Sequence, residues 1–393
     1  MFNTEQVIEY LLAFMIAFLI SFSATPIAKV ISRKIGAIDV PNDDRRMHTK
    51  PLARSGGLAI IAGFMASVLF LVINAYFENL PIIPLRQLIG IFSGALIVAA
   101  VGIIDDIKRV DAKIKFLVQA VAAVCVVVIG GMRIEYLTNP FIKLGYSRLP
   151  LYISYPLTIL WIMAITNAVN LIDGLDGLAA GTTAISCISL FIITLLINKD
   201  AYFAPMVAVM ALALAGSATG FLPFNFHPAK IIMGDSGAYF MGFILGTISI
   251  QGALKSYTAI SISIPIIVLG LPLFDTTTAF LRRIFNKQFF MRADRKHIHH
   301  KLIDMGLSHK QAVIVMYTAT AALGLSAIVM ANKGPLSAII LMIIVAAFVV
   351  GGAFFMKDIN IDEMPVKNAE TIEKQKDNPA AQSSIVAGNV RNN

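Results

Sequence analysis

The sequence predicts an all-α integral membrane protein with about eleven transmembrane helices, and composition is the first reason. Hydrophobic residues make up 57% of the 393 residues, charged residues make up only 14%, and the mean hydropathy is +0.78. A soluble domain of this length is far less apolar. The apolar residues also gather in runs of about 20, the length that crosses a lipid bilayer. Together these observations predict a chain that spans the membrane many times.

The predicted spans follow one another along most of the chain. They lie near 7–30, 56–77, 87–104, 114–132, 151–170, 178–197, 203–222, 237–253, 259–281, 311–331 and 336–356. The first run is too long for a signal peptide and has no small-residue cleavage site, so we expect it to remain as a span. Residues 357–393 hold too little apolar material to fold. We expect one transmembrane domain, residues 1–356, and a disordered cytoplasmic tail, residues 357–393.

The distribution of positive charge predicts which loops face the cytoplasm. Nineteen Lys and Arg lie in one set of loops and seven in the opposite set. The first set comprises residues 31–55, 105–115, 171–177, 223–236 and 282–310. Because cytoplasmic loops carry the excess of Lys and Arg, this set is predicted to be inside and the amino terminus outside. On the outer side, alternating apolar residues in 133–149 predict a small hairpin.

Polar residues interrupt the apolar pattern between the fifth and sixth spans. Asn167, Asn170, Asp173 and Asp176 are each three residues apart, which predicts one stripe on a helix. Ionisable residues at membrane depth are functional candidates by default. The alternative is that these groups only satisfy one another inside a helix bundle.

Acidic residues also stand at the ends of two other spans. Asp105 and Asp106 are adjacent and are followed by four cations that include Lys115. Adjacent carboxylates repel each other unless a cation relieves them, and Mg²⁺ does so while also holding phosphate oxygens. The alternative is an acidic helix end paired with the nearby Lys and Arg. Asp235 lies in a Gly-Asp-Ser-Gly turn at a predicted helix start, where it suits either a simple cap or a metal-bound phosphate.

Two basic loops complete the set of candidate residues. The late loop contains Arg295, His297, His299 and His300, and the first inner loop contains His48. Densely packed cations and imidazoles recognise anions. Two alternatives are a loop that faces lipid headgroups and, less favoured, a zinc site. Both cysteines fall in apolar runs and are expected to form no disulfide or metal site.

These candidates all fall on the predicted cytoplasmic side, so one cavity at the inner face could gather them. Phosphoryl transfer depends mainly on positioning and on neutralisation of charge by metal ions and cations. The pattern therefore indicates a phosphoryl donor from the cytosol that meets a lipid phosphate acceptor.

Five motifs, in this order and spacing, resemble the polyprenyl-phosphate N-acetylhexosamine-1-phosphate transferase family. They are Pro41–Gly57, Asp105-Asp106, Asn167–Gly181, Phe221–Gly237 and His297-Ile-His299-His300. The resemblance implies transfer of a sugar-1-phosphate from a UDP-sugar to undecaprenyl phosphate, with Mg²⁺ or Mn²⁺ as cofactor and with release of UMP, at the bacterial cytoplasmic membrane. The late histidine run is interrupted by Ile298. The neighbouring Met305-Gly-Leu-Ser-His309 is similar to the branch of the family that transfers N-acetylglucosamine-1-phosphate for wall teichoic acid or other surface glycans.

The resemblance also implies roles for individual residues. The implied catalytic residues are Asp105, Asp106, Asp173 and Asp235, of which Asp235, Asp106 and Asp173 are the implied metal ligands. The implied substrate-binding residues are His48, Lys115, Asn167, Asn170, Asp176, Asn225, Arg295, His297, His299 and His300. No nucleic acid is expected as a partner, and a homodimer is left open. Two alternative functions are a phospho-MurNAc-pentapeptide transferase and, from another class, an ion-coupled transporter.

Overall fold

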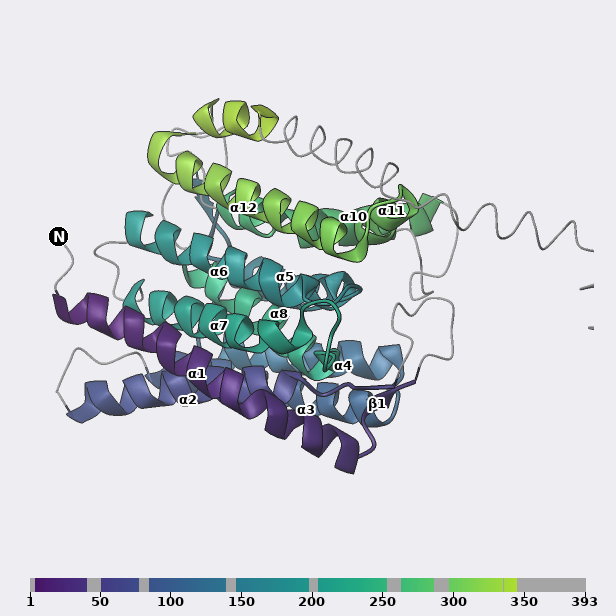
Figure 1. Ribbon diagram of the computed structural model, residues 1–393. Helices are drawn as coiled ribbons and strands as arrows, with labels where there is room; N and C mark the ends of the chain where they lie inside the picture. Colours follow the sequence, from purple (N-terminus) through teal and green to yellow (C-terminus); the bar gives the residue numbers. More distant parts are fainter. Residues whose placement is uncertain are drawn as a thin grey trace, which may run out of the picture.

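The computed structural model describes residues 4–40, 51–77, 85–138, 146–197, 204–252, 263–285, 297–334 and 336–344, and nearly all of them are helical. The helices are α1 (Thr4–Lys34), α2 (Gly57–Phe77), α3 (Leu85–Ile107), α4 (Ala112–Val124) continued by the π-helix η1 (Cys125–Ile129), α5 (Leu151–Ile172), α6 (Leu178–Ile197), α7 (Ala204–Asn225), α8 (Gly234–Gly252), α9 (Ser263–Val268), α10 (Gly270–Phe285), α11 (Ile298–Asp304) and α12 (His309–Lys333). Figure 1 shows the long helices side by side, with α12 packed on α6, α6 on α7, and α7 on α1.

Eight of the described helices are long and apolar enough to cross a membrane, which confirms the predicted class of an all-α multispanning protein. They are α1, α2, α3, α4 with η1, α5, α6, α7 and α12. The predicted span 237–253 is the helix α8, which is not among these eight. The last predicted span is helical over 336–344, and the rest of it lies outside the described residues, as does the predicted tail. The count of eleven and the orientation stay predictions.

The predicted span 259–281 is two helices, α9 and α10, with a break at Leu269. Pro272 explains the break, because a proline has no N–H to donate to the carbonyl four residues earlier. That carbonyl belongs to Val268, and it accepts a hydrogen bond from the Ser186 hydroxyl of α6 instead, at 3.3 Å. A neighbouring helix thus satisfies the backbone group that the proline frees.

Two short hairpins flank the bundle. Strands β3 (Tyr136–Thr138) and β4 (Tyr146–Arg148) pair antiparallel, which confirms the hairpin predicted in 133–149. Strands β1 (Ile38–Asp39) and β2 (Leu52–Ala53) also pair antiparallel, and the sequence pattern did not predict them. The second hairpin is tied to the segment before α8, because Ile232 N donates to Ala53 O at 2.8 Å. This contact places Arg54 beside the start of α8.

Glycines allow α8 to begin in close contact with α2 and α3. A Cβ atom on Gly57 would lie 2.1 Å from Gly237 N, and one on Gly102 would lie 2.5 Å from Ser236 Cα. The absence of a side chain at Gly57 thus permits the start of α2 to pack against the start of α8. The close approach brings the carboxyl end of α3 against the first turn of α8.

The predicted polar stripe does not continue as a helix. α5 ends at Ile172, and Asp173 follows as its C-cap with ψ of 49°. Gly177 has φ of +81°, a left-handed conformation that glycine adopts at no steric cost. Only Asn167 and Asn170 are therefore helical, and Asp173 and Asp176 lie on the loop that joins α5 to α6. We refer to residues 173–177 as the α5–α6 loop. Cys125 and Cys187 are free, as expected.

Candidate active site

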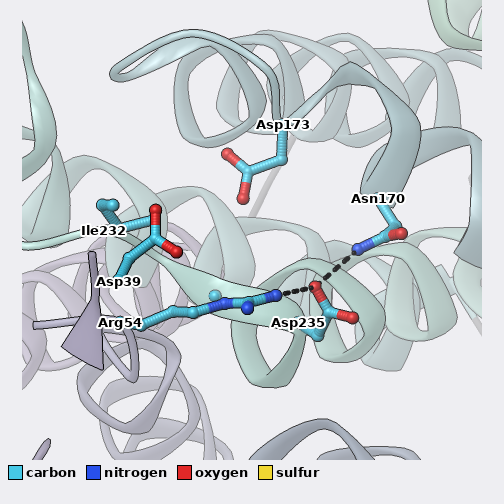
Figure 2. Close-up of a pocket in the computed structure, with 7 residues that line it drawn as sticks. Asp39, Arg54, Asn170, Asp173, Ile232 and Asp235 are labelled. Carbon is cyan, nitrogen blue, oxygen red and sulfur yellow. Dashed lines mark hydrogen bonds and ion pairs between the residues drawn. The ribbon is translucent and has the colours of Figure 1, made fainter. Parts of the chain in front are cut away.

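A polar cavity of about 290 Å³ lies where the α5–α6 loop faces the start of α8 (Figure 2). Its lining comes from four separate parts of the chain. The lining residues are Asp39, Arg54, Asn170, Asp173, Ile232, Gly234 and Asp235. The structure therefore brings three of the predicted site residues, Asn170, Asp173 and Asp235, to one cavity.

Asp235 is the most heavily contacted acid of the cavity. One carboxylate oxygen accepts hydrogen bonds from Arg54 Nη2 at 3.1 Å and from Asn170 Nδ2 at 3.3 Å. The other oxygen accepts one from Lys115 Nζ at 3.1 Å. Two cations and an amide thus converge on one carboxylate, and charge-assisted hydrogen bonds of this kind are the stronger ones. This arrangement stabilises a negative charge at the start of α8.

Asp106 lies behind Asp235 and caps α8 from the end of α3. Its Oδ1 accepts from Asp235 N at 2.8 Å, and its Oδ2 accepts from Ser236 N at 3.3 Å and from Ser236 Oγ at 2.7 Å. Arg54 Nε is also 3.3 Å from Asp106 Oδ1. An acceptor is favoured here because the first N–H groups of a helix have no partner within the helix. Both oxygens of Asp106 are therefore occupied by protein donors.

Asp105 plays a different part from its neighbour. It accepts a hydrogen bond from Val110 N at 2.7 Å, which closes the turn between α3 and α4. It also pairs with Lys115 Nζ at 2.7 Å. Lys115, on α4, consequently bridges Asp105 and Asp235 and lies 6.0 Å from the centre of the Tyr239 ring. Among the cations that follow Asp105, Lys115 thus acts as a charge partner of the acids, as the alternative interpretation of the acidic pair predicts.

Asp173 approaches the cavity from the opposite side, on the α5–α6 loop (Figure 2). Burial first, and the negative charge of Asp235 second, raise the pKa of Asp173 to about 7. A carboxyl group that is costly to ionise in isolation becomes favourable as an anion when a divalent cation lies beside it.

The oxygen atoms around the cavity suit a hard cation such as Mg²⁺. Such ions prefer carboxylate oxygens and retain several water ligands. Asp235 and Asp173 face the cavity and fit as ligands. Asp106 is predicted as a third ligand, and for this it would have to share oxygens that already accept hydrogen bonds from α8.

The two asparagines of α5 point to different neighbours. Asn170 reaches Asp235, whereas Asn167 Nδ2 donates to Gln119 Oε1 of α4 at 2.6 Å and to Met163 O at 2.7 Å. Asn167 is thus held against α4 and does not line the cavity. It contributes to the site by fixing α5 to α4, the helix that carries Lys115.

Asp176 and Asn225 hold the end of the α5–α6 loop. Asn225 Oδ1 accepts from Gly177 N at 3.1 Å, and its Nδ2 donates to Ile231 O at 3.0 Å. Asp176 Oδ2 lies 2.8 Å from His227 Nδ1, and His309 Nε2 accepts from Asp176 N at 2.9 Å. The possible ligand atoms of Asp176, His227 and His309 lie within 4.8 Å of one another. His227 and His309 were not among the site residues that the sequence predicted.

The described part of the late loop begins at His297, so Arg295 and, in the first inner loop, His48 lie outside the described residues. His297 Nδ1 is 2.9 Å from Asp275 Oδ2 of α10. His299 is 1% exposed, and its ring lies against Gly174 of the α5–α6 loop. The rings of His299 and His300 are 4.3 Å apart. Of the predicted histidines, His299 therefore lies against the loop that carries Asp173, and His297 and His300 lie near it on the chain.

Sequence reasoning missed Arg54, which lines the cavity, and Asp275, which contacts His297 outside it. Arg54 was one cation among six in a basic loop, and nothing in the local pattern separated it from the others. Asp275 did give a signal, because it is an acid inside a predicted apolar span, where ionisable residues are functional candidates.

Comparison with known proteins gives a consistent set of relatives. The pattern of the family described as "Glycosyl transferase family 4" matches residues 88–253. A Bacillus subtilis protein named "Probable undecaprenyl-phosphate N-acetylglucosaminyl 1-phosphate transferase" is 42% identical over 327 residues, which cover 83% of this chain and 86% of the relative. A Mycolicibacterium smegmatis protein named "Decaprenyl-phosphate N-acetylglucosaminephosphotransferase" is 32% identical over 83% of this chain and 84% of its own. An Escherichia coli protein named "Undecaprenyl-phosphate alpha-N-acetylglucosaminyl 1-phosphate transferase" is 27% identical over 75% of this chain and 77% of its own.

Proposed function

This chain belongs to glycosyl transferase family 4, and we propose that it transfers N-acetylglucosamine-1-phosphate from UDP-N-acetylglucosamine to undecaprenyl phosphate. The names of the three relatives above all describe transfer of N-acetylglucosamine phosphate to undecaprenyl or decaprenyl phosphate. The structural observation that carries the proposal is the convergence of Arg54, Lys115 and Asn170 on Asp235. Cations and carboxylates gathered beside one cavity suit phosphoryl transfer, which depends mainly on positioning and on neutralisation of charge.

In the proposed reaction, an oxygen of the lipid phosphate attacks the phosphorus that carries the sugar. A new P–O bond forms there, the bond from that phosphorus to the phosphate oxygen of UMP breaks, and UMP leaves as an anion. Mg²⁺ or Mn²⁺ would supply neutralisation of the phosphate charge. The lipid phosphate is already largely ionised near neutral pH, because its second pKa is about 6 by analogy with phosphoserine, so a protein base is not needed.

The residues at and beside the cavity would have different roles in this reaction. Asp235 and Asp173 would hold the metal ion from two sides of the cavity. Arg54 and Lys115 form ion pairs with Asp235 and so balance the charge of the carboxylates. Both cations would also contact phosphate oxygens of the substrates. Asp106 fixes the start of α8 and thereby the direction of the Asp235 side chain.

We also propose that the cavity opens to the cytoplasm in a bacterial cytoplasmic membrane. The excess of Lys and Arg in the loops on this side supports that orientation. The carboxyl ends of α3 and α5 and the start of α8 all contribute to the cavity region, so a donor from the cytosol would meet the lipid phosphate at the membrane surface.

The test supplies purified protein with undecaprenyl phosphate, Mg²⁺ and radiolabelled UDP-N-acetylglucosamine. We expect a labelled lipid diphosphate sugar and one UMP per lipid, loss of both with EDTA, and recovery with Mg²⁺ or Mn²⁺. A parallel reaction with UDP-MurNAc-pentapeptide should give no product. Asp235→Asn should abolish turnover, and Asp304→Asn, a change at an exposed acid, should leave it unchanged. Absence of labelled lipid with verified substrates and metal would refute the proposal.

A further inference from the structure

Asp275 is a buried acid outside the cavity, and the reaction outlined above gives it no part. It lies on α10, is 2% exposed, and does not line the cavity. An uncompensated carboxylate in such surroundings is strongly destabilising, and even a paired one is seldom better than an apolar residue. Its two contacts therefore point to a purpose beyond stability.

Both carboxylate oxygens of Asp275 contact the start of α11. Oδ2 lies 2.9 Å from His297 Nδ1, and Oδ1 accepts a hydrogen bond from Ile298 N at 2.9 Å. A carboxylate can only accept, so the His297 ring must carry a proton on Nδ1. This leaves Nε2 as the ring nitrogen that is available to another group.

The two contacts of Asp275 fix the start of α11, and His299 on this helix lies against the α5–α6 loop. A Cβ atom on Gly174 would lie 2.2 Å from His299 Nε2, so the ring packs directly on the glycine that follows Asp173. The rings of His297 and His299 are parallel to within 4°, with centres 5.8 Å apart. A continuous set of contacts thus runs from Asp275 through two histidines to the edge of the cavity.

We propose that Asp275 is a positioning residue that holds His297 in its Nδ1–H form and anchors α11. His297, His299 and His300 then present a fixed set of nitrogens to the sugar nucleotide. The role rests on the proposed function and on the substrate-binding role that the family resemblance implies for these histidines. Carboxylates that orient an imidazole in this way also fix ligating histidines, and loss of such a carboxylate typically costs about 10–100-fold in affinity or activity.

Asp275→Asn separates positioning from a purely structural role. The asparagine oxygen can still accept from Ile298 N, so the start of α11 keeps its partner. Its NH₂ group would then face His297 Nδ1, and because this group only donates, the ring would have to move its proton to Nε2. Asp275→Asn thus keeps the shape of the side chain at this position and moves the ring proton of His297 from Nδ1 to Nε2.

The kinetic experiment compares Asp275→Asn with the wild type in detergent. We expect kcat/KM for UDP-N-acetylglucosamine to fall by about 10–100-fold, with the KM for undecaprenyl phosphate unchanged. Asp304→Asn, at an exposed acid of α11, is the matched control and should behave as the wild type. His297→Ala and the double variant with Asp275→Asn should show equal losses, because residues that act through one another are not additive. Additive losses, or full activity of Asp275→Asn, would overturn the proposal.

A second readout does not depend on turnover. The chain has six histidines, so ¹⁵N-histidine labelling gives a small NMR spectrum in which the His297 signals are those lost in His297→Ala. We expect a proton on Nδ1 of His297 in the wild type and on Nε2 in Asp275→Asn. A wild-type ring with its proton on Nε2 alone would reject the role of Asp275. Failure of the wild type to make lipid product, with the expected spectrum, would instead reject the proposed function.

Discussion

Arg54 Nη2 lies 3.1 Å from Asp235 Oδ1 (Figure 2). Nε of the same guanidinium lies 3.3 Å from Asp106 Oδ1. One cation thus relieves the repulsion between two acids that come from α3 and α8. Arginine suits this position because its planar fork can contact two acceptors at once and stays charged at every working pH. The guanidinium also stands where a divalent cation would have to share Asp235.

Arg54→Ala should lower turnover and at the same time lower the Mg²⁺ concentration needed for half-maximal activity. Removal of a positive charge about 3 Å from Asp235 strengthens the attraction of the carboxylates for a divalent ion, while the phosphate oxygens lose a partner. The measurement is a Mg²⁺ titration of UMP release at saturating substrates. We expect the loss of turnover to be about a hundredfold, comparable to the loss of one preorganised donor in other active sites.

The control for this experiment is Arg109→Ala, which removes an exposed cation from the loop after α3. It should change neither turnover nor the Mg²⁺ requirement, because exposed charges are largely screened by solvent and salt. An Arg54→Ala protein with normal turnover and an unchanged Mg²⁺ titration would show that the ion pair has no functional role.

Asp106→Asn should destabilise the protein by about 1–3 kcal/mol, the cost of leaving a buried donor unsatisfied. An asparagine offers only one acceptor oxygen, so either Asp235 N or Ser236 N would face an NH₂ group in place of an acceptor. The change is measured as a shift of the unfolding midpoint in detergent. Ser236→Ala, which removes only the hydroxyl donor, should cost less.

The same variant also decides the role that the sequence predicted for Asp106. Normal stability combined with a weakened Mg²⁺ response would identify it as a metal ligand and contradict its assignment as the cap of α8. Lost stability with a residual, normally Mg²⁺-dependent activity would support the cap.

The adjacent acids show where sequence reasoning reached its limit. The apolar runs and the charge distribution predict the class of fold, because each is a local property of the chain. Asp105 and Asp106 look equivalent in sequence, yet one pairs with Lys115 and closes a turn while the other caps α8. Their difference depends on the helix that packs against each oxygen, and no local pattern carries that information.

The α5–α6 loop gives a second example. A spacing of three residues predicted one helical stripe, but the helix ends at Ile172 and the two asparagines turn to different partners. The glycines at 174 and 177 did mark the point where the helix could end. What sequence could not show is that His299 and Asn225, from distant helices, hold the loop in place.

His299 should make the stability of the protein fall as the pH falls below about 6.5. Burial lowers the pKa of this imidazole to about 3, with the nearby charge of His300 as the second cause. Its pKa in the unfolded chain is about 6.5, so between these values the unfolded chain binds a proton that the folded protein does not. The full stability is present above about pH 6.5, and the loss at pH 5.5 is about 1.4 kcal/mol.

The measurement compares unfolding midpoints at pH 7.5 and pH 5.5 for the wild type and for His299→Gln, whose side chain does not titrate. Carboxylates titrate alike in both proteins, so the difference isolates His299. We expect the wild type to lose more stability on acidification than the variant. Equal losses would contradict the assignment of a neutral, buried imidazole.

Gly174→Ala should weaken the use of UDP-N-acetylglucosamine without unfolding the protein. The new methyl group would meet His299 Nε2 at 2.2 Å, so the imidazole must move away from the α5–α6 loop. A displacement of about 1 Å near a reacting centre can cost as much as a hundredfold in rate, and here we expect a higher KM for the sugar nucleotide. Gly270→Ala is the matched control, because its Cβ would meet only the Leu323 side chain, at 3.3 Å. His299→Ala removes the clash, so Gly174→Ala should add no further loss in that background, whereas an added loss would place the effect in the loop backbone and not in the histidine.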